Sequence, residues 1–460
     1  MNKDLVFEIG TEELPSSCIL EGVEGLKDIL IRKLKQERVS FLQVDTLGTP
    51  RRLTAIVKGI DEMQNSQQRV ITGPPKKIAF EADGTPTQAA IGFARSLGLK
   101  ADELEEIDTE RGIYLGKTVQ EEGKPVLEVL PDLLKQAITD ISFSKQMYWG
   151  DYSLKFARPI RWILALWGDK VVDFEIENLK SGRLTYGLRT IPDNPLAVEN
   201  AGCYLDLIDS KGMIMINPDH RCQKILDSLS WMEQNQWGGK YQVVMDHELL
   251  AEVVNLVEFP HVLAGKFSGH FLYIPQDILI KAIEYHQRYF AVIDEKGQVT
   301  NNFLVVQNGT DDNSGDIIKG NQRVLEARLS DAVFFYEEDK KHGFDQWLEK
   351  LKGVIFYSGL GSMHDKVNRL EKLAQYLSME LGQSHIKDDA CRAARLCKCD
   401  LVTNMVVEFP ELQGVVGREY ALEKGENSKV ANAIFEHYLP RFAEDILPES
   451  ETGAVLSIAD

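Results

Sequence analysis

The fold of this chain is decided around one stretch, Ala393-Ala394-Arg395-Leu396-Cys397-Lys398-Cys399-Asp400-Leu401-Val402-Thr403-Asn404-Met405. Its spacing of apolar residues predicts a helix from Ala390 to Val407 that carries Asp400 on its buried side. A lone buried carboxylate is costly, so Asp400 must be paired, metal-bound or protonated. The stretch therefore raises the question of whether Asp400 takes part in chemistry or is the remnant of a site that once did.

The sequence around this stretch predicts an all-helical region. From Gly361 onward, apolar residues recur at three- and four-residue spacing, as in Val367, Leu370 and Ala374. Further helices are expected over 429–438 and from Gly453 to the last residue. Because that last helix has no cap or polar tail, we expect more protein beyond Asp460.

Upstream of this region, strand and helix patterns are mixed. Short apolar strands are expected at 5–9, 52–57, 163–167 and 303–308, and amphipathic helices at 20–34 and 127–141. The predicted fold class is multidomain α+β. It has a discontinuous mixed region (1–72 and 124–340), a small inserted helix-and-hairpin module (73–123) and a helical region (341–460) that is truncated at its C-terminal end.

Composition points to an ordinary globular protein. Of the 460 residues, 43% are hydrophobic and 27% charged, and no run of about 18 apolar residues predicts a membrane span. The N-terminus lacks the apolar core of a signal peptide, so a cytoplasmic location and no membrane partner are expected. Six cysteines form no Cys-x-x-Cys pair, which favours small buried thiols over disulfides or a zinc site.

Local basic clusters are the candidates for RNA contact, because arginines bind phosphates and neighbouring rings stack on bases. The net charge of −19 argues against a generally basic surface, so each cluster must be judged separately. The candidates are Arg51, Arg52, Arg158, Arg161, Arg183, Arg189, His286, Arg288, Arg323, Arg328, Arg392, Arg395 and Arg441. The competing interpretations are solvated turns, arginines paired with acids, and a histidine satisfied within the core.

Catalytic motifs are missing from the sequence. It has no phosphate-binding Gly-x-x-x-x-Gly-Lys-Ser/Thr loop, no Gly-x-Ser-x-Gly elbow and no His-Glu-x-x-His, so no ATP site and no catalytic residue are expected in this chain. One metal scheme fits in part. His364, the Cys399-Asp400 pair and Asp460 occupy the positions of metal ligands in HD-type phosphohydrolases. Cys399 stands where the central histidine should be, so we expect a degenerate site with no metal.

Several separate motifs resemble the beta subunits of heterotetrameric bacterial glycyl-tRNA synthetases, and the resemblance runs from end to end. They are Glu8–Pro15, Pro50–Leu53, Phe156–Pro159, Arg323–Phe335, Lys398–Met405, Pro440–Phe442 and Ser457–Asp460. The resemblance implies an assembly of two alpha and two beta subunits. In that assembly the alpha subunit holds the glycine and ATP site and uses Mg²⁺, while the non-catalytic beta subunit binds tRNA(Gly) and is needed for charging.

The resemblance also implies a fold. The front part would resemble editing-type domains of the phenylalanyl-tRNA synthetase beta chain, and the helical part a degenerate HD domain. A C-terminal anticodon-binding domain would be absent here. Asp400 would then be a relic paired with a nearby arginine such as Arg441. Two alternatives remain open, a metal-dependent phosphohydrolase of the HD type and an assembly scaffold without RNA contact.

Overall fold

The chain forms two compact units, Met1–His220 and Arg221–Asp460. The computed structural model describes residues 2–81, 84–110, 112–191, 195–312, 314–443 and 445–460. Helices and strands are mixed within the chain, as predicted. Among the described residues, no helix combines the length and the apolar character that crossing a membrane requires.

The first unit is built on a seven-stranded sheet in which β1 is central. The strand order is β11-β12-β9-β1-β3-β2, with β10 paired to β9. Strand β1 runs antiparallel to both β3 and β9. The strands are β1 (Lys3–Thr11), β2 (Gln43–Thr49), β3 (Arg52–Ile60), β9 (Ile160–Trp167), β10 (Lys170–Val171), β11 (Glu175–Ile176) and β12 (Leu179–Gly182).

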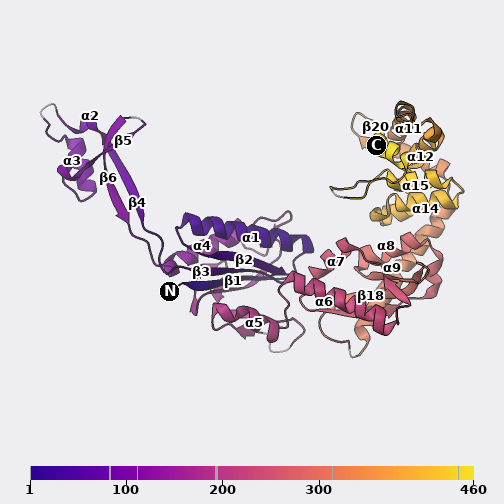
Figure 1. Ribbon diagram of the computed structural model, residues 1–460, viewed down its shortest axis with the longest axis horizontal. Helices are drawn as coiled ribbons and strands as arrows, with labels where there is room; N and C mark the ends of the chain where they lie inside the picture. Colours follow the sequence, from indigo (N-terminus) through magenta and orange to yellow (C-terminus); the bar gives the residue numbers. More distant parts are fainter. Residues whose placement is uncertain (1, 82–83, 111, 192–194, 313, 444) are drawn as a thin grey trace. The chain divides into compact units, whose positions relative to one another are not determined.

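Two helices cover one face of this sheet, α1 (Ser16–Gln36) and α4 (Val126–Asp140), as Figure 1 shows. Alternation along β1 explains the layering, because successive side chains of a strand point to opposite faces. Leu5, Phe7 and Ile9 pack into the core beneath these helices. Glu8 is fully buried on the opposite face, near the short helix α5 (Tyr204–Ser210).

Smaller elements complete the first unit. A hairpin joins β7 (Met147–Tyr148) to β8 (Lys155–Phe156). A second pair joins β13 (Leu184–Tyr186) to β14 (Pro195–Ala197). The hairpin of β7 and β8 encloses the loop 149–154, and residues of this loop line a pocket in the first unit.

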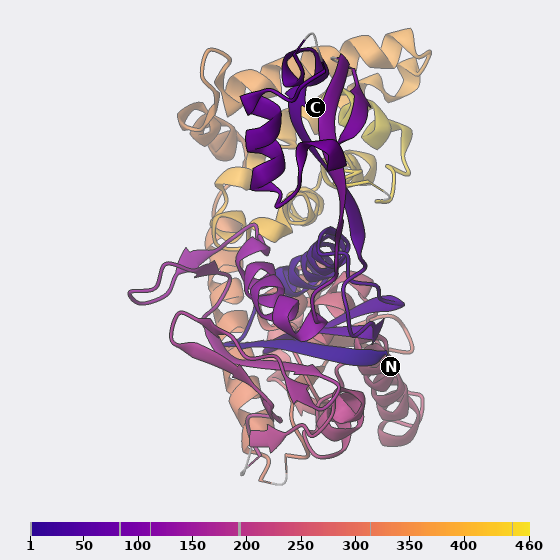
Figure 2. The ribbon, with the colours of Figure 1, turned by 90° about the vertical axis from the view of Figure 1, so that its left-hand side faces the viewer.

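The inserted module has a three-stranded sheet and two short α-helices. Its elements are β4 (Gln67–Pro75), α2 (Lys76–Ala79), α3 (Gln88–Ser96), β5 (Glu105–Thr109) and β6 (Gly112–Glu121). Figure 2 shows α3 beside the sheet of order β4-β6-β5. The ladder begins at Gln67 rather than at residue 73, and β4 continues through Gly73-Pro74-Pro75. The two prolines, which lack an N–H, only interrupt the register between Thr72 and Pro75 instead of ending the strand.

The second unit begins with an antiparallel sheet of order β15-β17-β18-β16. Helices α6 and α7 share a core with one face of this sheet, and α8 and α9 with the other. The elements are α6 (Pro218–Trp231), β15 (Tyr241–Val243), α7 (His247–Val254), β16 (Pro260–Lys266), α8 (Gln276–Gln287), β17 (Phe290–Asp294), β18 (Val299–Asn308) and α9 (Asp316–Lys340).

The helical region shares its core with this sheet. Buried residues from Phe267 to Leu456 form one cluster that includes Leu325 and Leu329 of α9. Contacts between residues therefore divide the chain into two compact units after His220. The prediction placed a domain boundary at 340 instead. The charged segment 337–341 suggested that boundary, but α9 continues to Lys340 and buries Asp339.

The remaining elements of the second unit are nearly all helical. They are α10 (Phe344–Lys350), β19 (Ile355–Tyr357), β20 (Gly361–Ser362), α11 (Met363–Glu380), α12 (Lys387–Leu396), α13 (Asn404–Glu408), α14 (Val415–Glu423), α15 (Ser428–Glu436) and α16 (Glu451–Ala459).

The predicted helix from Ala390 to Val407 is wrong in its continuity. Helix α12 ends at Leu396, a 3₁₀ turn follows over Cys399–Val402, and α13 begins at Asn404. Thr403 breaks the helix because its backbone is extended and its Oγ1 caps α13 by accepting a hydrogen bond from the N–H of Val406 at 3.2 Å. Asp400 therefore lies in the 3₁₀ turn between two short helices.

Candidate nucleic-acid interface

Arg52 is a buried structural residue, which contradicts its prediction as an RNA contact. Its side chain is 0% exposed and pairs with Glu8, with 3.3 Å between Nη1 and Oε2. The guanidinium also donates to Oγ1 of Thr185 at 3.2 Å and to the carbonyl of Tyr186 at 2.8 Å. The same carboxylate of Glu8 accepts hydrogen bonds from Trp162 and Tyr204. No phosphate reaches a guanidinium held in this way.

Arg158, Arg161 and Arg189 come together around the acids that follow β1; these three are termed the arginine cluster. Arg161 Nε lies 3.3 Å from one carboxylate oxygen of Glu12, and Arg189 Nη1 lies 3.7 Å from the other. Arg158 Nε donates to the carbonyl of Glu13 at 3.0 Å. Arg161 and Arg189 have side chains that are 60% and 64% exposed, so their ion pairs are weak.

Backbone hydrogen bonds fix the segments that carry the arginine cluster. The N–H of Thr11 donates to the carbonyl of Arg51 at 2.8 Å, and the N–H of Glu12 donates to that of Pro159 at 3.0 Å. The ends of β1, β3 and β9 are therefore tied together at this edge of the sheet. Three arginines against Glu12 and Glu13 leave one excess positive charge there, which suits an anionic ligand.

Two other predicted residues of the first unit have structural partners. The Arg51 guanidinium lies 5.6 Å from the centre of the Trp162 ring, a cation–π distance. Arg183 donates to the carbonyls of Val198 and Asp169, each at 3.2 Å. Arg183 is therefore a loop-bracing residue in this structure and not an open phosphate contact.

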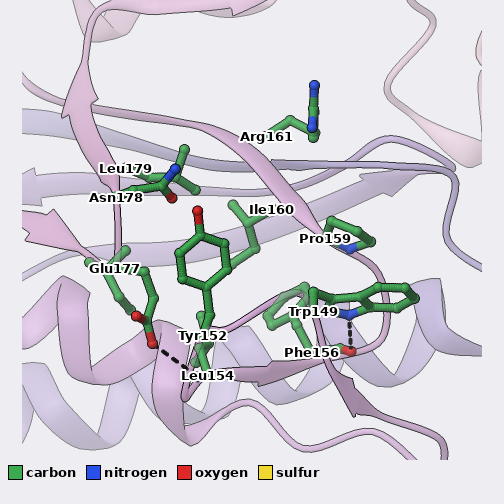
Figure 3. Close-up of a pocket in the computed structure, with 11 residues that line it drawn as sticks. Trp149, Tyr152, Leu154, Phe156, Pro159, Ile160, Arg161, Glu177, Asn178 and Leu179 are labelled. Carbon is green, nitrogen blue, oxygen red and sulfur yellow. Dashed lines mark hydrogen bonds between the residues drawn. The ribbon is translucent and has the colours of Figure 1, made fainter.

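A pocket opens beside Arg161, and sequence reasoning did not identify it (Figure 3). Tyr152 stands in its middle, and Trp149 and Pro159 line one side. The Trp149 indole donates to the carbonyl of Phe156 at 2.9 Å, which holds the loop against β8. The sequence signal for this pocket was the aromatic run around Gly150, which lies between Trp149 and Tyr152.

In the second unit the predicted arginines lie mostly in surface ion pairs. Their partners are Glu252 for Arg288, Asp331 and Glu408 for Arg328, Glu426 for Arg392, Glu371 for Arg395 and Asp445 for Arg441. Arg323 is exposed on α9. The side chain of His286 lies outside the described part of the chain. These residues are not gathered around one feature as the arginine cluster is.

The four HD-type positions do not converge on one centre. His364 lies within 3.2 Å of Asn368 on its own helix α11. Cys399 is fully buried, and its Sγ lies 3.9 Å from the carbonyl of Arg395. Burial raises the pKa of the Cys399 thiol well above its usual range. Across the described residues, no group of three or more acids, histidines and cysteines is arranged to hold a metal ion.

A lysine ammonium binds Asp460, the last of the four HD-type positions. Nζ of Lys398 donates to Nε2 of His437 at 2.9 Å and to Oδ2 of Asp460 at 2.7 Å. Lys366 Nζ lies 2.7 Å from the other oxygen of Asp460. The sequence pattern did not predict Lys366 or His437 as part of this centre, although Lys398 lies within residues 393–405.

The protonation states in this centre follow from burial and from the two lysines. Burial and the nearby charge of Lys398 together lower the pKa of His437 to about 3, so the ring is neutral. His437 Nδ1 then donates to the carbonyl of Ile434 at 2.6 Å, which leaves Nε2 to accept from Lys398. Burial acts to raise the pKa of Asp460, but Lys398 and Lys366 outweigh it, and the pKa is lowered. The centre thus consists of the Asp460 carboxylate between the ammonium groups of Lys398 and Lys366, and a neutral His437 ring that accepts a hydrogen bond from Lys398.

Asp400 is not paired with Arg441, which corrects that expectation. Arg441 bonds to Asp445, with 2.8 Å between Nε and Oδ2. Oδ2 of Asp400 instead accepts a hydrogen bond from the N–H of Gly414 at 2.6 Å, and Oδ1 has no hydrogen-bond partner in the described part of the chain. Burial raises the pKa of this carboxyl from 3.8 to about 6.

Replacing Asp400 by asparagine is expected to stabilise the protein above pH 6. Because the folded pKa of about 6 exceeds the unfolded value of 3.8, the native state binds the extra proton, and its stability falls as pH rises between these values. A shift of this size corresponds to about 3 kcal/mol. The difference in free energy of unfolding between Asp400→Asn and wild type should therefore grow between pH 4.5 and pH 7.5 in urea denaturation.

The control for this titration is Asp388→Asn, which changes an exposed acid on the neighbouring helix α12. That variant should differ from wild type by the same amount at both pH values. A constant difference for Asp400→Asn as well would show that the buried carboxyl keeps its ordinary pKa.

Comparison with known proteins shows similarity along the whole chain. A family model described as "Glycyl-tRNA synthetase beta subunit" matches residues 5–460. The chain is 42% identical over 460 residues to the glycine–tRNA ligase beta subunit of Clostridioides difficile (strain 630). It is 41% identical over 461 residues to that of Desulforamulus reducens. Each comparison covers 100% of this chain and 66% of the relative, so the chain spans about two thirds of the relatives' length.

Proposed function

This chain belongs to the family of glycyl-tRNA synthetase beta subunits, and from that premise we propose that it is a tRNA-binding, non-catalytic part of a glycine–tRNA ligase. The family match over residues 5–460 carries the proposal. The chain acts together with an alpha subunit in attaching glycine to tRNA(Gly), in an assembly of two alpha and two beta subunits. ATP and Mg²⁺ are used at the alpha subunit, and the reaction takes place in the cytoplasm.

Family membership also supports two finer assignments of fold. The first unit and the sheet of the second correspond to editing-type domains of the phenylalanyl-tRNA synthetase beta chain, and the region 341–460 corresponds to an HD domain without its metal. The donor set around Lys398 agrees with the second assignment, because an ammonium there would repel a divalent cation. The metal-dependent phosphohydrolase alternative has no ligand set among the described residues.

The arginine cluster is the part of the first unit best suited to contact the tRNA backbone. Arg161 and Arg189 are exposed and are held only by weak surface pairs with glutamates, so a phosphate can replace a glutamate as their partner. Arg158 is half-buried beside them and adds its charge while it donates to the carbonyl of Glu13. The other candidates of this unit are less available, since Arg52 is buried and Arg183 bonds to carbonyl groups.

Neutralising the arginine cluster tests this role. The triple variant Arg158→Gln, Arg161→Gln and Arg189→Gln should bind tRNA(Gly) about tenfold or more weakly than wild type at moderate salt. The slope of the logarithm of affinity against the logarithm of salt concentration should fall by roughly one for each phosphate that the variant no longer neutralises. Filter binding of a tRNA(Gly) transcript over a range of salt concentrations measures both quantities.

A matched control removes the same charge elsewhere in the first unit. The variant Arg32→Gln, Arg69→Gln and Arg95→Gln changes three exposed arginines outside the cluster and should bind like wild type. Equal affinity and equal salt slope for both triple variants would instead favour the assembly scaffold without RNA contact at this edge.

A further inference from the structure

The pocket beside Arg161 has the size and lining of a site for one flat ring. Its volume is about 330 Å³, near the lower end of the range for small-ligand pockets. Aromatic and aliphatic side chains form most of its wall, among them Trp149, Tyr152 and Ile160. Figure 3 shows the Tyr152 ring standing upright within it, with Ile160 beside it and Pro159 and Trp149 farther to one side.

Polar groups without partners also line this pocket. Tyr152, which is 42% exposed, points its hydroxyl toward the side where Asn178 lies (Figure 3). Neither the Tyr152 hydroxyl nor the Asn178 amide forms a hydrogen bond with any part of the chain that the structure describes. An amide offers one donor group and one acceptor, the pair of functions that hydrogen-bonds the edge of a nucleobase.

A strained residue holds the pocket in shape. Glu177 has a φ of 50°, in the left-handed region that residues other than glycine seldom adopt. Its carboxylate accepts hydrogen bonds from the N–H of Ser153 at 3.0 Å, the Ser153 hydroxyl at 2.7 Å and the N–H of Leu154 at 3.0 Å. Glu177 thereby fixes the loop 149–154 in place beside the pocket. Its positive φ belongs to the two-residue turn that joins β11 to β12, so the hairpin and these contacts together hold the loop in one conformation.

The positive charge beside the pocket indicates which kind of ring-containing ligand the pocket can bind. Arg161 belongs both to the pocket lining and to the arginine cluster, so a ring in the pocket would lie beside a positively charged edge. A nucleotide combines a flat base with a phosphate and can contact both the ring surface and the positive edge. An apolar side chain of a protein partner would leave the arginines and the polar groups of Tyr152 and Asn178 without interaction partners from the ligand.

We propose that this pocket binds one unstacked base of a single-stranded RNA segment, which stacks on Tyr152 while Arg161 contacts the adjoining phosphate. The inference rests on the proposed tRNA-binding function and adds to it a subsite for an unpaired nucleotide. Asn178 contacts the edge of the base, and Glu177 keeps the loop in its binding position without touching the RNA.

Two RNA probes test the proposal with the whole chain. The first is a single-stranded tetraribonucleotide that contains 2-aminopurine, whose fluorescence is quenched when the base stacks. The second is a tRNA(Gly) transcript. Tyr152→Ala should abolish the quenching and weaken tRNA(Gly) binding about tenfold, in line with the loss of one base–aromatic stack. Tyr152→Phe, which keeps the ring, should retain most of the quenching.

The matched control is Tyr148→Ala on the same hairpin. Tyr148 is 57% exposed and does not line this pocket, so both probes should bind this variant like wild type. Equal quenching by wild type and Tyr152→Ala would overturn the inference while leaving the proposed function intact. Tyr152-dependent quenching without any tRNA(Gly) binding would support the pocket and count against the proposed function. Normal binding of both probes by Tyr152→Ala, with loss of assembly with the alpha subunit, would assign the pocket to a protein partner and overturn the inference.

Discussion

Arg52→Ala should lower the free energy of unfolding of the first unit by about 3–5 kcal/mol, the usual effect of removing one partner from a buried ion pair. The substitution leaves the carboxylate of Glu8 fully buried without its cation. It also removes the donors to Thr185 and to the carbonyl of Tyr186. Urea denaturation followed by tryptophan fluorescence measures the loss, because Trp162 donates to the same carboxylate.

Two further variants distinguish the effect of losing the buried ion pair from the loss of stability that any substitution in this region would cause. Arg51→Ala changes the preceding arginine, which is only half-buried, and should cost less than about 1 kcal/mol. The double variant Glu8→Gln with Arg52→Met should be more stable than Arg52→Ala, because no unpaired charge then remains buried. A loss below about 1 kcal/mol for Arg52→Ala would mean that water reaches Glu8 and solvates it.

Asp339→Ala should destabilise the second unit by a similar amount, about 3–5 kcal/mol, since several buried donors lose their acceptor together. The Asp339 carboxylate, 1% exposed, accepts from the backbone N–H of Asn404 at 2.8 Å and of Met405 at 2.9 Å. It also accepts from the Tyr420 hydroxyl at 3.1 Å. One side chain of α9 thus holds the first turn of α13 and a residue of α14.

Thermal unfolding of Asp339→Ala should show a fall in melting temperature of roughly 10 °C, at about 2–4 °C for each kcal/mol in a unit of this size. The control is Glu338→Ala, which removes a neighbouring acid that pairs with Lys341 at the surface. Asp339→Asn should also be destabilised, because its amide group would face backbone N–H donors. If Asp339→Ala melted like wild type, another acceptor or water would have to satisfy Asn404 and Met405.

Local patterns predicted the regular elements well, and the reason is physical. The alternation in Leu5–Ile9 and the spacing of Leu26, Ile29 and Leu30 each report which side of an element is buried. The break at Thr403 was not predictable in the same way, because it depends on Asp339, which is remote in sequence and accepts the N–H groups exposed by the break. A local pattern contains no information about such a distant acceptor.

The candidate site shows the same difference between features that a local sequence pattern predicts and features that depend on distant residues. Arg51 and Arg52 are adjacent and look equivalent in the sequence, yet only Arg52 is sealed beside Glu8. Arg51 lies in the turn before β3 and Arg52 is the first residue of β3, and each guanidinium lies 5.6 Å from the Trp162 ring, so the sequence does not show which of the two faces an acid. The pocket depends on contact between the loop 149–154 and Glu177, residues that only folding brings together.

Lys398 gives the helical region a property that a bound metal would not have. A metal ion fills its site only to the extent that its free concentration and its dissociation constant allow. The ammonium between His437 and Asp460 is covalently part of the chain, so its occupancy is complete in every folded molecule. This centre is therefore indifferent to chelators and to metal scarcity, and the cell need not supply an ion for it to form.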